Sequence, residues 1–234
     1  MKKLITLTIV MTVLLQGGAP IQASIIGFLS SPGVNGVFSN GGEWSPNEDG
    51  FGVKWTVSQN QDESWHYKYE FLKANGDPLE KLTSHITISL SDNITENDLY
   101  NFGSDIDEVT FGTFGPAPSN PGFPTGKSIY GVKFDLTDDQ AVVEFDCTRQ
   151  PMWGDFYAKS GFSQSKDSPD EWNYAYNVDI GVDVANLHNY MSTPVDALDN
   201  ELFKILVPNT IPEPATIFMV GLGCLNLIRR KYKT

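Results

Sequence analysis

The chain contains few cysteines, few histidines and no apolar run of the length of an ordinary membrane span. Of its 234 residues, two are cysteine and three are histidine. Cys224 lies near the C-terminus, so the central part of the chain holds Cys147 alone and forms no internal disulfide. A domain of this kind depends on its hydrophobic core for stability, and its lone cysteine is expected to be buried and unreactive.

The commonest catalytic motifs are also missing. The sequence has no His-Glu-x-x-His segment, no paired-cysteine motif and no Gly-x-Ser-x-Gly elbow. The first two hold zinc, and the third carries the nucleophile of many serine hydrolases. Ser84 and His85 are adjacent, and adjacent residues of a strand point to opposite faces. The sequence therefore predicts neither a zinc centre nor a Ser–His–Asp triad.

Positive charge is scarce. The chain has 16 Lys and Arg against 29 Asp and Glu, which gives a net charge of −13. Six of the basic residues lie at the two ends of the chain: Lys2, Lys3, Arg229, Arg230, Lys231 and Lys233. Nucleic acids bind basic surfaces, so no nucleic-acid partner is expected. Hydrophobic residues still make up 40% of the chain, as in an ordinary folded domain.

The first 23 residues have the pattern of a secretory signal peptide. Lys2 and Lys3 precede an apolar stretch over residues 4–15, and Gly and Pro at 17–20 interrupt it. The stretch is short for a hydrocarbon layer of about 30 Å, which favours cleavage over a permanent anchor. We predict export by the Sec machinery and cleavage between Ala23 and Ser24.

The end of the chain has three features in a set order. The triplet Pro212, Glu213 and Pro214 precedes an apolar segment over residues 215–228, and basic residues follow at 229–233, beginning with Arg229 and Arg230. As a helix the apolar segment is about 21 Å long at ~1.5 Å per residue, which suits a transient stop better than a permanent span. The basic end is expected to stay in the cytoplasm, which leaves the body outside.

This order of features resembles the PEP-CTERM sorting signal of Gram-negative bacteria. The resemblance implies that an exosortase-type membrane peptidase cuts near the triplet, and that the freed protein joins the cell surface or the exopolysaccharide matrix. The alternative is a plain C-terminal anchor with a chance triplet. We therefore divide the chain into a signal peptide (1–23), one β-domain (24–208) and a sorting signal (209–234) with a short transmembrane helix at about 215–228.

Alternation of apolar and polar residues dominates residues 24–208. It predicts about nine short strands, among them 51–57, 65–72, 85–90, 130–136, 141–147, 153–158, 172–182 and 203–207. The runs at 51–57 and 203–207 are expected to be the first and last strands. A capping-box pattern at Thr95 opens one short helix before Gly103, and residues 111–126, rich in Pro and Gly, are expected to form a long loop. The expected fold is all-β: a single, jelly-roll-like β-sandwich.

Parts of this domain resemble a group of exported bacterial proteins that carry the same tail. The resemblance rests on residues 65–69, 82–92, 130–134, 153–159 and 174–177. No activity is attached to that group. The resemblance therefore implies an exported, single β-domain and implies nothing about chemistry.

Aromatic residues make up 12% of the chain and suggest a carbohydrate ligand. Aromatic rings stack on the apolar faces of sugars, while neighbouring polar groups bond their hydroxyls. Trp44, Trp153 and Trp172 each lie near polar residues and are the candidates for stacking. The alternative is burial in the core, which the alternation around Trp65 and Trp172 favours.

No cofactor is expected, with calcium as the alternative. Asp105, Asp107 and Glu108 follow Gly103 in an expected loop, and Ca²⁺ prefers several oxygen ligands from such loops. The spacing is not that of an EF-hand. An acidic loop on an acidic domain is more often simply solvated.

Three functions remain open at this point. The first is a non-enzymatic surface or matrix protein associated with exopolysaccharide. The second is a secreted carbohydrate-active hydrolase with a carboxylate pair, for which Glu144 and Asp146 are one example on a single strand face. The third is a protein-binding module. Exposed tryptophans without paired acids favour binding, a cleft with two facing acids favours catalysis, and fully buried tryptophans favour a structural or protein-binding role.

Overall fold

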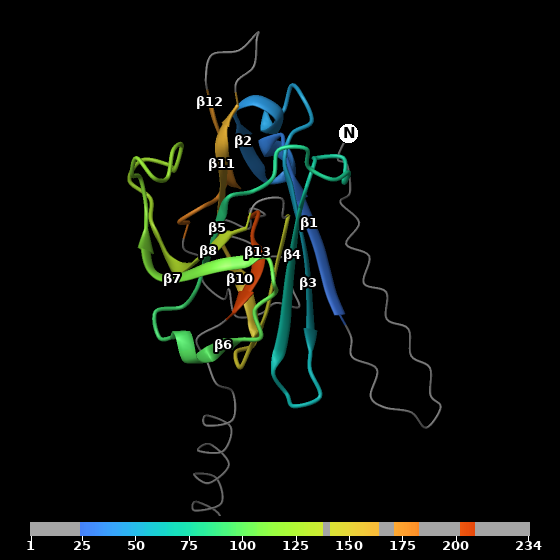
Figure 1. Cartoon of the computed structure of the whole chain (residues 1–234), viewed down its shortest axis with the longest axis vertical. Coiled ribbons are helices and arrows are strands. Elements are labelled where there is room, and N and C mark those ends of the chain that lie inside the picture. The colour runs from blue at the N-terminus through green and yellow to red at the C-terminus, as the bar shows by residue number, and fades with distance from the viewer. Residues whose placement is uncertain (1–23, 138–140, 164–170, 183–201, 209–234) are drawn as a thin grey trace, which may run out of the picture.

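The computed structural model describes residues 24–137, 141–163, 171–182 and 202–208. Over these residues the protein consists of β-strands, turns and three short 3-10 helices, and no α-helix occurs among them. The strands form three antiparallel sheets (Figure 1). The all-β prediction is therefore confirmed.

The two larger sheets contain five and six strands. The five-stranded sheet has the order β1 (Ser24–Ser30), β3 (Gly52–Gln59), β4 (Trp65–Leu72), β9 (Val142–Cys147), β6 (Leu99–Tyr100). The six-stranded sheet has the order β2 (Val37–Asn40), β12 (Glu171–Asn177), β11 (Phe156–Ser163), β5 (His85–Ser89), β8 (Ile129–Leu136), β7 (Ile106–Phe114). The third sheet pairs β10 (Pro151–Gly154) with β13 (Ile205–Pro208), and the 3-10 helices are η1 (Gly33–Asn35), η2 (Gly42–Trp44) and η3 (Glu96–Asp98).

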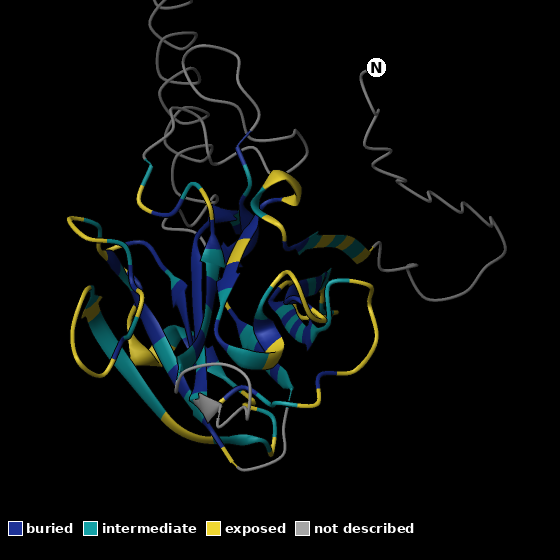
Figure 2. Ribbon diagram, turned by 90° about the horizontal axis from the view of Figure 1, so that it is seen from above, coloured by how far each residue is buried: buried dark blue, intermediate teal, exposed yellow. Residues whose placement is uncertain are grey.

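The inner faces of the two larger sheets contribute to one hydrophobic core (Figure 2). On β4 every second residue is buried, as the alternation predicts, and the hydroxyl of Tyr69 donates to the carbonyl of Leu206 at 2.7 Å. Across the core the rings of Phe134 and Phe145 lie 5.3 Å apart between centroids. Cys147 is buried, and burial raises the pKa of its thiol to about 12, so it is unreactive as predicted.

A buried ion pair links Lys204, the residue before β13, to Asp155, the residue between β10 and β11. The ammonium group of Lys204 lies 2.6 Å from a carboxylate oxygen of Asp155, and these side chains are 1% and 11% exposed. Lys204 also donates to the carbonyls of Asp179 and Val182, and Asp155 accepts from the side chain of Asn177. All three protons of the ammonium group thus have acceptors, which indicates a structural role.

The structure confirms most of the expected strands and corrects others. The expected first strand at 51–57 corresponds to β3, and the sequence pattern missed β1, β2, β6 and β7. The expected loop at 111–126 is wrong over its first four residues, because β7 extends to Phe114. The run at 172–182 ends at Asn177, because residues 178–181 form turns, and the run at 153–158 divides into β10 and β11 at Asp155. The helix after Thr95 is confirmed as η3, where Thr95 and Asp98 form the capping box.

The predicted signal peptide, the Pro212-Glu213-Pro214 triplet, the apolar segment and the basic end all lie outside the described residues. Ser24 is the first described residue and begins β1. Within the described ranges, the structure contains no helix with the length and apolar character needed to cross a membrane.

Candidate functional site

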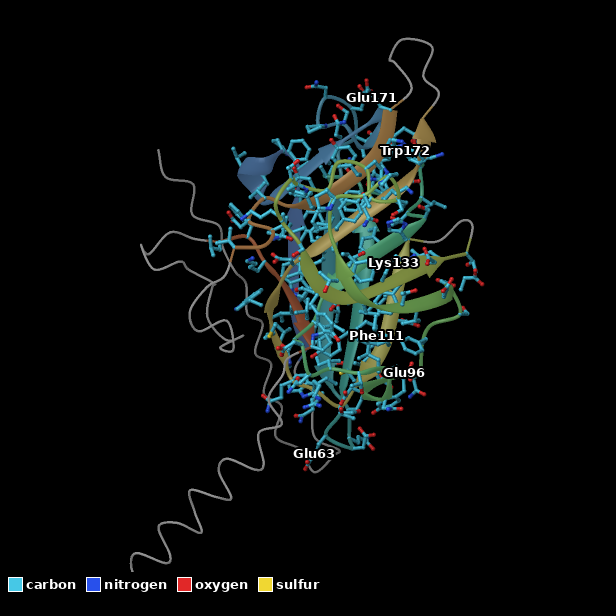
Figure 3. The ribbon with its side chains drawn as sticks, turned by 90° about the vertical axis from the view of Figure 1, so that its left-hand side faces the viewer. Glu63, Glu96, Phe111, Lys133, Glu171 and Trp172 are labelled. Carbon is cyan, nitrogen blue, oxygen red and sulfur yellow. The ribbon has the colours of Figure 1, made fainter. Side chains whose placement is uncertain are left out.

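The outer face of the six-stranded sheet carries four aromatic side chains, which we call the aromatic strip: Phe38, Trp172, Tyr174 and Tyr176. Phe38 lies directly opposite Tyr176, and their rings stack with centroids 5.0 Å apart. The rings of Tyr174 and Tyr176 are nearly parallel, with 4° between their planes. Phe38 is 40% exposed and the other three are partly exposed. Trp172 marks one end of the strip near the top of Figure 3.

Beside the strip, the same face bears five charged or polar residues, which we call the polar centre: His85, Thr87, Lys133, Asp135 and Lys159. Strand pairing places Lys159, His85 and Asp135 in one row and Thr87 opposite Lys133 in the next. Lys133 forms a 2.6 Å ion pair with Asp135. The ammonium group of Lys159 lies 4.6 Å from the centroid of the Trp172 ring, so the polar centre adjoins the strip.

The connection between β7 and β8, residues 115–128, folds across part of this face. The hydroxyl of Tyr157 donates to the carbonyl of Pro121 at 2.7 Å, and Lys159 donates to the carbonyl of Ser119 at 3.2 Å. Gly122 has a positive φ of 71°, and a Cβ there would lie 2.1 Å from the ring of Tyr174. Only glycine permits this close approach, which places the connection beside the strip.

Two side chains of the polar centre are buried without hydrogen-bond partners. Among the described residues, neither Nε2 of His85 nor the hydroxyl of Thr87 has a partner. Burial, with the nearby charge of Lys159, lowers the pKa of His85 to about 4, so its ring is neutral at neutral pH. Burial also lowers the pKa of Lys159, as does the charge of Lys133. An unpaired buried polar atom costs about 1–3 kcal/mol, and a ligand hydroxyl that reached these atoms would recover part of that cost.

The buried histidine predicts a specific pH dependence of stability. The folded-state pKa of His85, about 4, lies below the ordinary value of 6.5, so the unfolded chain binds the proton more tightly. The free energy of unfolding should be highest above pH 6.5 and fall toward pH 4, by up to about 3 kcal/mol from this group. Urea unfolding across this range should show the slope in wild type and in the partly exposed control His66→Gln. His85→Gln should remove it, and an equal slope in that variant would contradict the assignment.

The three tryptophans predicted to stack on sugars differ in their exposure to solvent. Trp44 is fully buried against Phe51 and donates from its indole to the carbonyl of Lys81 at 2.8 Å. Trp153 is 8% exposed and packs edge-on against another core ring. A buried ring offers no face to a sugar, so stacking at Trp44 and Trp153 is a wrong prediction. Trp172 belongs to the outward strip, although its alternation favoured burial.

The three acids considered for calcium do not share a loop. Asp105 precedes β7, whereas Asp107 and Glu108 lie within it, next to an irregularity in its pairing with β8. Glu108 is paired with Asp135 across the two strands. Among the residues that the structure describes, no group of three or more His, Cys, Asp or Glu side chains is arranged to hold a metal ion.

A second polar row crosses the outer face of the five-stranded sheet. Strand pairing places Ser58, His66 and Asp146 side by side, and Nδ1 of His66 lies 2.8 Å from a carboxylate oxygen of Asp146. Burial alone would raise the pKa of Asp146, but hydrogen bonds from Asn101 and His66 outweigh it and lower that pKa. Among the described residues, Ser58 donates no hydrogen bond to His66. A carboxyl with a lowered pKa does not suit the general acid of a glycosidase, so Asp146 is a poor candidate for that member of the carboxylate pair.

No family model, curated protein or solved structure matches this chain. The arrangement of the outer face is therefore the main structural evidence on function. It combines stacked, partly exposed rings with charged and hydrogen-bonding groups on neighbouring strands.

Proposed function

We propose that the protein is an exported, non-enzymatic β-domain that binds polysaccharide through the aromatic strip and the polar centre. The observation that carries this proposal is the partial exposure of four rings beside Lys159 and Asp135 on one sheet face. Sugars stack on aromatic rings through their apolar faces and hydrogen-bond to polar groups through their hydroxyls. Both kinds of group are present within one face.

The ends of the sequence support the place of action. The signal-peptide pattern and the Pro212-Glu213-Pro214 tail support export, processing by an exosortase-type peptidase and residence at the cell surface or in the exopolysaccharide matrix. We also infer that the two larger sheets form a single β-sandwich, since residues of both belong to one hydrophobic core. In such a sandwich the aromatic strip lies on the outer face of the six-stranded sheet, where residues 115–128 cover Tyr157 and leave the strip partly exposed.

A glycan array tests the proposal with the full chain purified in mild detergent. We expect binding to at least one bacterial polysaccharide, and Phe38→Ala should weaken it by about tenfold, the loss expected for one stacked ring. Phe102→Ala is the matched control, because Phe102 is 39% exposed against 40% for Phe38 and belongs to neither the strip nor the polar centre. Equal binding by both variants would contradict the proposed site.

The same preparation separates binding from hydrolysis. Glu108 and Asp135 are paired across β7 and β8, so a carboxylate pair adjoins the polar centre. A non-enzymatic protein releases no reducing sugar from the polysaccharide it binds. Release that Asp135→Asn abolishes would replace the proposal with a hydrolase.

A further inference from the structure

Among the residues that the structure describes, strand β1 is an edge of the five-stranded sheet and pairs with β3 alone. The two larger sheets end in four edge strands, and three of them are short or irregular: β6 has two residues, β2 has four, and β7 carries two exposed acids beside an irregularity. β1 has seven residues, without charge or proline. Proteins usually blunt such edges with charges, prolines or bulges, because an exposed flat edge pairs with other chains.

The exposed side chains of β1 are apolar. Ile26 is 56% exposed and Phe28 is 42% exposed, and both lie on the outer face of the five-stranded sheet. Gly27 lies between them, and a Cβ there would collide with the ring of Trp55, so the ring packs directly on the strand. Ser30 forms a bridge with Gly36 outside the sheet, and within the described part of the chain residues 24–29 have no strand partner other than β3.

The sequence of β1 is close to symmetric about its central glycine. In antiparallel pairing centred on Gly27, Ile26 of one chain lies opposite Phe28 of another, and Ile25 lies opposite Leu29. Each pair combines two large apolar residues, and cross-strand pairs of an aromatic with a β-branched residue stabilise sheets. Pairing with an identical strand is therefore self-complementary, as a twofold interface requires.

Charge also favours this edge as the meeting point of two copies. The chain has a net charge of −13, so most approaches of two copies bring acidic surfaces together. The side chains of β1 carry no charge, and the residue beside Phe28 on β3 is Lys54.

We propose that the protein self-associates through antiparallel pairing of β1 with β1 of a second copy, about a twofold axis at Gly27. The two five-stranded sheets then become one continuous sheet, with Ile26 and Phe28 of each copy covering one another. The contact is short, so the dimer should be weak and dependent on concentration. It does not involve the aromatic strip, which remains free on the other sheet.

Sedimentation velocity of the full chain in mild detergent, over a range of protein concentrations, tests this proposal. We expect a monomer–dimer equilibrium whose dissociation constant rises at least tenfold in Ile26→Lys. Val34→Lys is the control, because Val34 is 80% exposed, lies outside β1 and receives the same charge. Its dissociation constant should match that of wild type. Thermal unfolding shows whether each variant is folded.

Hydrogen exchange gives an independent measurement that does not need a variant. In wild type, alternate amides within residues 25–29, those that point away from β3, should gain protection as protein concentration rises. Three results would each overturn the proposal. They are a monomer at every concentration, a dimer that Ile26→Lys leaves intact, and protection of β1 only after addition of an unrelated extended peptide.

Discussion

Lys204→Met should destabilise the protein by about 3–5 kcal/mol, which is a large share of the stability of a domain of this size. The side chain of Lys204 is 1% exposed and its ammonium group lies 2.6 Å from Asp155. Removing it leaves the Asp155 carboxylate in a largely buried place, where the remaining donors among the described residues are the side chain of Asn177 and the amide of Gly181. Two backbone carbonyls also lose their partner.

The comparison that isolates burial is the same substitution in an exposed pair. Lys54 lies 2.8 Å from Glu70, but these side chains are 39% and 25% exposed. Surface ion pairs contribute about 0–1 kcal/mol, so Lys54→Met should have a small effect. Denaturant unfolding of both variants measures the difference. Equal losses would mean that the Lys204 network does not hold the third sheet in place.

The sequence predicted the strands of the core better than it predicted which side of a strand is buried. On β4 the large aromatic residues point inward, as the alternation suggests. On β12 the order is reversed: Asn173, Ala175 and Asn177 are buried and the aromatic residues face outward. Alternation identifies two faces without saying which one meets the core.

The reversal on β12 has a physical cause that lies far away in the chain. Asn177 is buried because its side chain donates to Asp155 and to the carbonyl of Phe203 and accepts from the amide of Phe156. These partners come from β11 and from the segment before β13. Their meeting depends on strand order, which local sequence does not encode.

The local sequence pattern revealed neither the edge strand β7 nor the grouping of residues in the polar centre. β7 lies at an edge of its sheet, most of its residues are only partly buried, and it therefore has no clear alternation. His85, Asp135 and Lys159 come from three strands that pair side by side although they are distant in sequence. The sequence named aromatic residues as candidates for sugar stacking, but only the strand register shows which residues share a face.

Replacing Pro212, Glu213 and Pro214 with alanines should abolish processing of the tail. The triplet, the apolar segment at 215–228 and the basic end are expected to act as one signal, with the two prolines keeping the cleavage region extended. The basic cluster resists passage through the bilayer, since moving an arginine through hydrocarbon costs a few kcal/mol. The variant should therefore remain in the inner membrane at full length.

Fractionation and mass spectrometry of the cell envelope measure this outcome. In wild type we expect a mature chain that begins at Ser24 and has lost its tail. Alanine substitution of three residues that lie outside the predicted signals, Asp62, Glu63 and Ser64, should leave processing unchanged. A triplet variant that reaches the surface or medium with its tail removed would contradict the sorting prediction.

Binding of polysaccharide at the aromatic strip is the central claim, and tryptophan fluorescence tests it most directly. The chain has five tryptophans; Trp44, Trp55, Trp65 and Trp153 are buried, and Trp172 is partly exposed. A sugar that stacks on the strip should therefore change the emission of Trp172 above all. Titration with the polysaccharide identified on the array should give a saturable change in wild type that Trp172→Phe removes. The same change in Trp172→Phe, or binding without any change in wild type, would contradict the claim.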